Sequence, residues 1–274
     1  MKNVKDILKE NNFRFNKAFG QNFITDTNLL KAMVDDAGIN NEDIVVEIGP
    51  GAGTLTKKIA HKAKKVFSFE IDKNLEPILK ETLDGENNVD IIFKDIQKVK
   101  DDELFEIIGT KDFKVVANLP YYITTPIIMR FLESDNVPKT ITIMVQKEVG
   151  ERLVAKAGDS EFGAITLAVN LEGEAKITRI VKKEMFMPMP KVDSAIVRID
   201  TLNTYNDVDK KAVKKLIKAA FLMRRKTLIN NIANAYKIEK DEIAKILKGL
   251  GIDEKVRGEE LDIDKYIALA DKLN

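Results

Sequence analysis

Four short apolar segments recur in the first 120 residues of this 274-residue chain, and helix-like stretches separate them. The segments span residues 44–48, 66–69, 89–93 and 113–117, and each has the length of a buried strand. Strands that alternate with helices form a parallel sheet, because each helix returns the chain to the edge where the next strand begins. The alternation therefore predicts an α/β fold in which the ends of these strands gather at one edge.

The first three of these segments end in residues suited to an adenosine-containing cofactor. Gly49-Pro50-Gly51-Ala52-Gly53 follows the first, and its glycines allow a close backbone approach before a helix that starts at Thr54. Glu70 follows the second, at the interval of about 20 residues that suits an acid binding ribose hydroxyls. Asp95 follows the third and can accept from an adenine amino group. The glycine loop contains no Lys or Arg, which favours S-adenosylmethionine over a phosphate-containing nucleotide.

The fourth segment ends in Asn118-Leu119-Pro120-Tyr121, a sequence suited to an exocyclic base amine. Such an amine is a poor nucleophile because its lone pair is delocalised into the ring. The Asn118 side-chain oxygen and the Leu119 carbonyl can accept both amine hydrogens, Pro120 restricts the backbone, and Tyr121 offers a flat face to a base taken out of its stack. A tight turn after a strand remains the alternative interpretation of these four residues.

Two further strands are expected over residues 175–181 and 194–199, and a helix over 126–134 with Pro126 at its start. After about residue 200 the composition becomes helical and basic. Residues 203–240 contain ten Lys or Arg against three acids, although the formal net charge of the whole chain is only +1. We therefore expect a sheet domain over 1–202 and a helical domain over 203–274 whose basic face contacts RNA phosphates; a solvated helix surface is the alternative.

Composition excludes several kinds of site. The chain has no cysteine, so disulfides, thiolate metal sites and a cysteine nucleophile are excluded, and its one histidine, His61, falls in a lysine-rich segment typical of a solvated surface. No metal site is expected. No apolar run is long enough to span a membrane, and the N-terminus has no apolar signal segment, so the sequence predicts a cytoplasmic protein, with nothing to indicate more than a monomer.

Five motifs in order resemble the S-adenosylmethionine-dependent rRNA adenine N6,N6-dimethyltransferases, and in particular the small-subunit (16S) branch of that family. They are Gly20-Gln21-Asn22-Phe23, Glu47-Ile48-Gly49-Pro50-Gly51-Ala52-Gly53, Asn118-Leu119-Pro120-Tyr121, the segment from Phe186 to Ser194, and Arg224-Arg225-Lys226-Thr227-Leu228. The resemblance implies a seven-stranded, Rossmann-like class I methyltransferase sheet with a small all-α C-terminal domain. It also implies a substrate of two adjacent adenosines near the 3′ end of small-subunit rRNA, within the immature subunit.

The resemblance also implies roles for individual residues. The cofactor would be bound by Asn22, Ile24, Gly49, Gly51, Glu70, Asp95 and Asn118. Asn118 and Leu119 would hold the target amine, and Tyr121 and Phe186 would hold the two faces of the base. The RNA backbone would be bound by Arg224, Arg225 and Lys226. Residue 122 is Tyr where many relatives have Asn.

Three other functions fit parts of this pattern. The large-subunit rRNA methyltransferases of the macrolide-resistance type share the glycine loop and the Asn-x-Pro-Tyr motif, but Gly20, Leu119 and the Arg-Arg-Lys-Thr-Leu run favour the small-subunit branch. A non-catalytic ribosome assembly factor would not need Asn118, Tyr121 and Glu70 intact. A nicotinamide oxidoreductase fits poorly with the G-x-G-x-G spacing.

Overall fold

The computed structural model describes Ile7 and residues 23–202, 204–223 and 225–273. The chain divides into two compact units, one formed by residues 1–150 and 176–201 and the other by residues 151–175 and 202–274. The sequence analysis placed a single boundary after residue 202. The division found here also assigns residues 151–175, which lie before the last strand, to the C-terminal unit.

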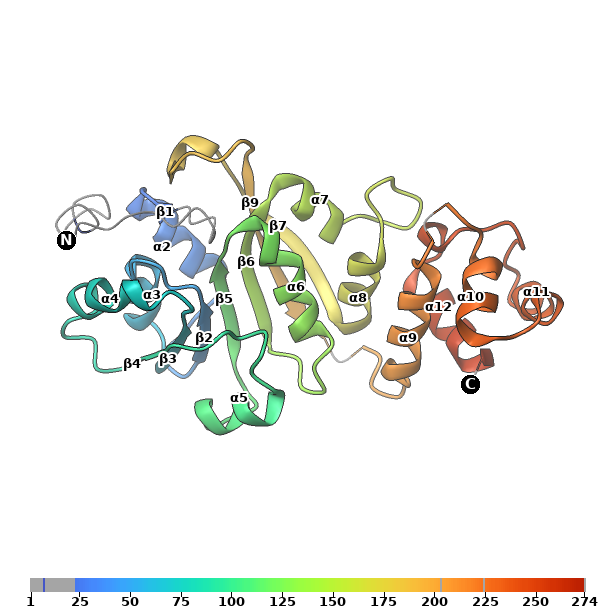
Figure 1. Ribbon diagram of the computed structural model, residues 1–274, viewed down its shortest axis with the longest axis horizontal. Helices are drawn as coiled ribbons and strands as arrows, with labels where there is room; N and C mark the ends of the chain where they lie inside the picture. The colour runs from blue at the N-terminus through green and yellow to red at the C-terminus, as the bar shows by residue number, and fades with distance from the viewer. Residues whose placement is uncertain (1–6, 8–22, 203, 224, 274) are drawn as a thin grey trace. The chain divides into compact units, whose positions relative to one another are not determined.

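The first unit contains a seven-stranded sheet in the order β4-β3-β2-β5-β6-β9-β7 (Figure 1). The strands are β2 (Ile44–Ile48), β3 (Lys65–Phe69), β4 (Val89–Ile92), β5 (Lys114–Asn118), β6 (Thr140–Gln146), β7 (Gly173–Val181) and β9 (Ser194–Thr201). The strands from β4 to β6 pair in parallel, and β9 pairs antiparallel to β6. The expected α/β sheet is confirmed, because apolar runs of this length are buried on both faces of a parallel sheet.

Helices cover this sheet and are α2 (Thr27–Asp36), α3 (Thr54–Ala60), α4 (Glu76–Thr82), α5 (Asp101–Ile108), α6 (Tyr121–Leu132) and α7 (Lys147–Leu153). Asp26 caps α2 by accepting from the N–H groups of Asn28 and Leu29, as its place before an apolar periodic segment predicts. Helices α2 and α3 share one buried apolar cluster with side chains of the central strands. This packing fixes the strand ends, where the site lies.

Helix α6 begins earlier than the sequence pattern indicated. The expected helix covered residues 126–134 and started at Pro126, but the observed helix starts at Tyr121 and Pro126 lies inside it. The first turn is instead preceded by Pro120, which has φ −53° and ψ 136°. Two tyrosines and two threonines made this turn look unlike a helix, and burial of Ile127, Ile128 and Phe131 against the sheet outweighs that preference.

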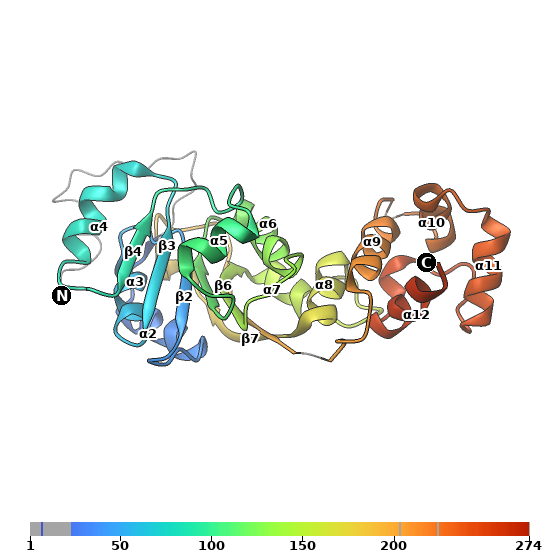
Figure 2. The ribbon, with the colours of Figure 1, turned by 90° about the horizontal axis from the view of Figure 1, so that it is seen from below.

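The second unit is helical, with α8 (Ala164–Glu172), α9 (Lys210–Ala220), α10 (Leu228–Tyr236), α11 (Lys240–Gly249) and α12 (Ile263–Leu273). Figure 2 shows α9 to α12 gathered into one group of helices. Their apolar faces form a common core with Leu167 and Leu171 of α8. Glu172, at the end of α8, is also bound by Lys210 and Lys214 of α9, so residues 151–175 join the C-terminal helices through apolar and ionic contacts.

Two short strands complete the fold: β1 (Phe23–Ile24) pairs antiparallel with β8 (Phe186–Met187). Among the described residues, short 3-10 turns cover Lys73–Leu75, Lys183–Met185 and Gly258–Glu260. Within the described ranges, no helix is long and apolar enough to cross a membrane.

Candidate active site

The site lies where the strand order of the sheet reverses. From β2 the chain proceeds outward through β3 and β4, and then returns to place β5 on the other side of β2. Open α/β sheets bind ligands at this point, beyond the carboxyl ends of the strands. Ile48 of β2 is paired with Ala117 of β5, so the residues that follow them, Gly49 and Asn118, are neighbours at this edge.

The glycine loop after β2 allows close approach on both of its sides. Gly49, Gly51 and Gly53 have φ values of 69°, 57° and 78°, a region that side chains disfavour. A Cβ atom on Gly49 would lie 2.9 Å from Leu119 Cδ2, and one on Gly51 would lie 3.0 Å from Phe23 Cε1. The segments that contain Leu119 and Phe23 therefore pack closely against the glycine loop, one on each side, and leave no room for a side chain at Gly49 or Gly51.

Glu70, at the end of β3, is fixed against this loop. Its Oε2 accepts from the Gly51 N–H at 3.3 Å, and its Oε1 accepts from the N–H groups of Ile71 and Asp72, each at 2.8 Å. The residue is 5% exposed, and burial raises the pKa of its carboxyl group above the ordinary value despite these donors. A carboxylate held in this way can accept further hydrogen bonds from a pair of hydroxyl groups.

Asp95, close after β4, is fixed by its own turn. One carboxylate oxygen, Oδ1, accepts from the Gln97 N–H at 3.0 Å. Lys94 beside it forms an ion pair with Glu103 at 2.7 Å. Asp95 remains partly exposed and can accept from a ligand, while the charge of Lys94 is directed to a neighbouring acid.

Asn118 and Leu119 present free polar atoms at the end of β5. Within the described part of the chain, the Asn118 side-chain amide has no hydrogen-bond partner. The Leu119 carbonyl likewise accepts no hydrogen bond from a described residue, since the first turn of α6 is closed by the Ile123 N–H bonding to Pro120. Two acceptors from adjacent residues therefore remain available to one ligand group.

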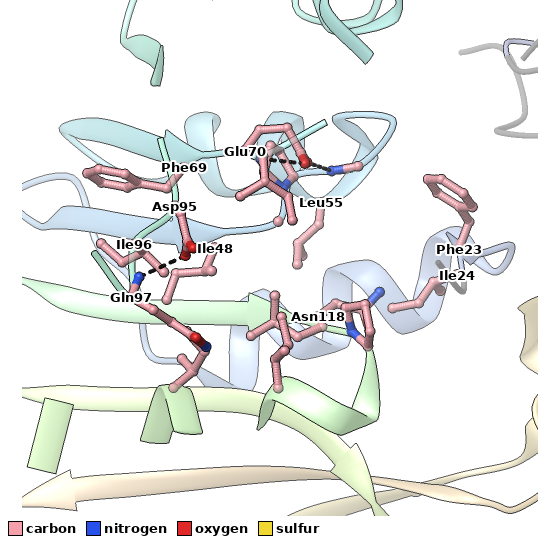
Figure 3. A pocket seen from close by; sticks show the side chains of 18 of the residues that line it. Phe23, Ile24, Ile48, Leu55, Phe69, Glu70, Asp95, Ile96, Gln97 and Asn118 are labelled. Carbon is pink, nitrogen blue, oxygen red and sulfur yellow. Dashed lines mark hydrogen bonds between the residues drawn. The ribbon is translucent and has the colours of Figure 1, made fainter. Parts of the chain in front are cut away.

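These strand ends enclose a pocket of about 290 Å³ (Figure 3). Figure 3 shows Phe69, Asp95 and Ile96 at one end and Phe23 and Ile24 at the other, with Asn118 at the end of β5. Of the residues predicted from the sequence, the lining contains Ile24, Gly49, Gly51, Glu70, Asp95, Asn118 and Leu119. Asn22 lies outside the described residues.

Tyr121 and Phe186, the two rings expected to hold the base, do not line this pocket. The Tyr121 hydroxyl lies 2.7 Å from the hydroxyl of Ser194, which is fully buried, and burial raises the pKa of Tyr121. Phe186 is 5% exposed and pairs through its backbone with Ile24 of the pocket wall. Both residues lie on segments next to the pocket, and their contact with a base is taken up below as a proposal.

Several lining residues were not expected from the sequence, namely Phe69, Ile71, Ile96, Gln97 and Tyr122. Ile71 and Ile96 directly follow the two acids that were identified, so their position after a strand-end acid was the available signal. Tyr122 follows the Asn-Leu-Pro-Tyr motif. No comparable signal indicated that its side chain, and not that of Tyr121, would face this pocket.

The lining fits S-adenosylmethionine. The glycine positions admit a ligand close to the backbone, Glu70 and Asp95 offer acceptors for ribose hydroxyls and an adenine amine, and apolar side chains flank them. The one lysine in the lining, Lys94, is paired with Glu103. These acceptors, with no unpaired lysine among the lining residues, suit a cationic adenosine derivative better than a nucleotide with phosphates. No three acidic, histidine or cysteine side chains of the described residues are grouped so as to hold a metal ion.

The predicted RNA-contacting turn lies in the second unit, between α9 and α10. Arg225 and Lys226 are exposed there, and Arg224 lies outside the described residues. The buried side chain of Asn231 fixes this turn: its amide nitrogen donates to the carbonyls of Ala220 and Met223, and its oxygen accepts from the Met223 N–H. These bonds hold the chain at Ala220 and Met223, shortly before the two exposed cations.

Comparison with known proteins gives consistent results. A family model described as ribosomal RNA adenine dimethylase matches residues 12–274. The chain is 43% identical to ribosomal RNA small subunit methyltransferase A of Alkaliphilus oremlandii, over 99% of this chain and 96% of that one. It is 44% identical to the protein of the same name from Bacillus licheniformis, over 98% of this chain and 95% of that one.

Solved structures show the same relationship. A dimethyladenosine transferase from Plasmodium falciparum superposes with a TM-score of 0.75 at 28% identity, covering 90% of this chain and 95% of that one. The 23S rRNA methyltransferase ErmE has a TM-score of 0.69 at 24% identity, covering 92% of this chain and 99% of that one. At that identity the second likeness is one of fold alone.

Proposed function

The chain belongs to the ribosomal RNA adenine dimethylase family, and on this premise we propose that it methylates two adjacent adenosines near the 3′ end of small-subunit rRNA. Each adenosine receives two methyl groups on N6. The observation that supports this reaction best is the pair of free acceptors, the Asn118 amide oxygen and the Leu119 carbonyl, at the edge of a pocket suited to S-adenosylmethionine.

S-adenosylmethionine supplies a methyl group that its sulfonium has already activated, so no strong base is required. Asn118 and Leu119 accept the two amine hydrogens, which draws the nitrogen lone pair out of the ring and toward the methyl group. When bound, S-adenosylmethionine would supply its methyl group to this nitrogen, which Asn118 and Leu119 would hold toward the cofactor, and the amine proton would pass to water. The enzyme contributes orientation and hydrogen bonds, and both act most strongly in the transition state.

Glu70 would bind the ribose and Asp95 the adenine of the cofactor, with Ile24, Gly49 and Gly51 beside the methionine part. Tyr121 and Phe186 would hold the faces of the target base. The Tyr121 ring is oriented by its hydroxyl contact with Ser194, and Phe186 is connected to the cofactor wall through its pairing with Ile24. Two tethered rings are a suitable arrangement for a base that must be held outside its stack.

The C-terminal helical domain, proposed over residues 203–274, would bind the RNA backbone through Arg225 and Lys226 together with Arg224. The physiological substrate would be an immature small ribosomal subunit, methylated in the cytoplasm by a monomer of this enzyme. Phosphate contacts of this kind set the position of a protein on RNA, while the pocket selects the base.

The test is transfer of labelled methyl groups to small ribosomal subunits that lack the 3′-end dimethyladenosines, with large subunits assayed alongside. We expect label at two adjacent adenosines of the small subunit, mapped by reverse-transcription stops. Label only on large-subunit rRNA would instead assign the chain to the resistance type. No label on either, with S-adenosylhomocysteine still bound, would indicate an assembly factor.

Asn118→Ala tests the chemical step within the same assay. Loss of one acceptor that acts in the transition state should reduce the rate by at least about 100-fold, while the melting temperature stays within a degree or so of the wild type. Methylation at the wild-type rate by a folded Asn118→Ala variant would remove Asn118 from the reaction.

A further inference from the structure

Tyr122 is the most exposed ring at the pocket. It lines the pocket, yet 60% of its surface is accessible to solvent. Its neighbour Tyr121 is half-buried, with its hydroxyl 2.7 Å from that of Ser194. Within the described residues, no hydrogen bond or ring contact involves the Tyr122 side chain. The pocket thus includes a mostly exposed aromatic ring with which no described side chain forms a hydrogen bond or ring contact.

The backbone that carries this ring is held in a helical turn by hydrogen bonds. Tyr122 is the second residue of α6, and the Ile123 N–H donates to Pro120 while the Thr124 hydroxyl donates to the Tyr121 carbonyl. The Tyr122 carbonyl has no N–H partner four residues on, because that residue is Pro126. The ring is therefore carried by a helical turn only four residues after Asn118, and a ligand that covers it must order the side chain but not the backbone.

Exposure argues against a structural role for this side chain. A tyrosine that is 60% exposed contributes little to a hydrophobic core, and no carboxylate or cation of the described chain holds its hydroxyl. Aromatic rings that are exposed at a nucleic-acid site bind bases by stacking, with a contribution that depends on the area of the base. The ring is next to the proposed target site and lies outside the contacts assigned to the target base itself.

We propose that Tyr122 stacks on the adenosine adjacent to the target, and so selects a pair of neighbouring purines. The inference rests on the proposed function, in which two adjacent adenosines are modified. While one adenosine is bound at Asn118, its neighbour is held one nucleotide away at the opening of the pocket, where Tyr122 supplies a face.

The test compares Tyr122→Ala, Tyr122→Phe and Tyr122→Asn with the wild type on small subunits that lack the dimethyladenosines. With S-adenosylmethionine saturating for each protein, loss of one stacked base should raise KM for the subunit by roughly 5- to 100-fold for the Ala and Asn variants. Tyr122→Phe should match the wild type, because it keeps the ring. Ile180→Ala, at an exposed apolar residue outside the pocket lining, serves as the surface control.

A second substrate makes the test specific. In small subunits whose rRNA has uridine in place of the neighbouring adenosine, the stacked area is smaller, so the wild-type KM should rise while that of Tyr122→Ala should change little. Equal losses in both proteins would overturn the inference. Wild-type labelling of the unaltered subunit tests the proposed function separately, since it does not depend on how any Tyr122 variant behaves.

Discussion

Two buried glutamates, one in each unit, differ in the partners that surround their carboxylates. Glu172 of the helical unit is 2% exposed and is bound by Lys210 and Lys214, each at 2.7 Å. Glu47 of β2 is 1% exposed and accepts a hydrogen bond from the Ser68 hydroxyl at 2.7 Å. No ion pair joins Glu47 to any described residue. Burial raises the pKa of Glu47 to about 7, with a further contribution from the charge of Glu70.

The two units differ in whether the burial of this carboxylate is offset by cations. Two lysines offset the burial of Glu172, so that carboxylate fastens α8 to α9 and serves stability. Glu47 lies two residues before Gly49 and has no cation as a partner, so burial disfavours its charged form and ionisation costs stability. Glu70 and Asp95 line the pocket and Lys94 is paired with Glu103, an arrangement that favours a cationic ligand such as a sulfonium. Stability should therefore depend on the two lysines beside Glu172 and, through the pKa of Glu47, on pH.

The largest effect on stability is expected when Glu172 loses its partners. Lys210→Met together with Lys214→Met leaves a buried carboxylate without a cation, and the free energy of unfolding should fall by about 3–5 kcal/mol. Adding Glu172→Leu should restore most of that loss, because a well-packed apolar side chain can replace a buried ion pair. Chemical denaturation measures both, and a double variant as stable as the wild type would contradict the contrast.

Glu47→Gln should raise the stability of the protein above pH 7, whereas loss of the two lysines lowers it. The pKa of this carboxyl group is about 7 in the folded protein and near 4.5 in the unfolded chain, so the native state binds more protons between these values. Wild-type stability should therefore fall as pH rises from about 4.5 to 7, by about 3 kcal/mol in total, and then level off. Glu47→Gln removes this term and should be the more stable protein above pH 7. A wild-type stability that rises through this window would show that Glu47 is not buried as described.

Glu70→Gln should weaken cofactor binding and also cost some stability. Both oxygens of Glu70 already accept backbone N–H groups, so an amide nitrogen must face at least one donor. We expect a loss of about 1 kcal/mol in stability and a roughly 10-fold increase in the Kd of S-adenosylhomocysteine. Calorimetric titration of Glu70→Gln beside Glu47→Gln compares two buried carboxyl groups of similar exposure. Unchanged affinity in Glu70→Gln would remove Glu70 from the cofactor site.

The smallest effect is expected at the turn after α9. Arg225→Gln with Lys226→Gln should leave stability and cofactor affinity unchanged and make the salt dependence of subunit binding shallower, by roughly 1.5–2 in the logarithmic slope. Lys245→Gln with Lys248→Gln removes the same charge from exposed positions of α11 and provides the matched control. Equal slopes in the two double variants would mean that the turn makes no specific phosphate contacts.

The central strands β2, β3, β5 and β6 could be predicted from the sequence because they are largely apolar runs buried on both faces. The start of α6 could not, since Tyr121, Tyr122 and Pro126 disfavour a helix locally and only the packing of later residues decides the matter. The grouping of residues 151–175 with the C-terminal helices likewise depends on contacts between Glu172 and lysines about 40 residues away, which local patterns do not show.

At the site, residues that end strands were predicted because parallel strands bring their ends together. Glu70 and Asp95 are of this kind, and both line the pocket. The direction of a side chain within a turn depends on particular partners instead. Ser194, more than 70 residues further along, lies beside Tyr121 and leaves Tyr122 to face the pocket. The motif could be recognised from the sequence, but tertiary contacts decide whether Tyr121 or Tyr122 faces the pocket.

The pairing of β1 with β8 has a consequence for turnover. Ile24 belongs to the cofactor wall and Phe186 to the proposed base site, and backbone hydrogen bonds hold the two together. If binding of a base moves the backbone at Phe186, it also moves Ile24 of the cofactor wall, and the two binding equilibria are then linked. Such linkage is reciprocal, so exchange of the cofactor changes the affinity for RNA by the same factor. Under the proposed reaction, in which one substrate receives four methyl groups, this linkage affects how often the RNA is released between transfers.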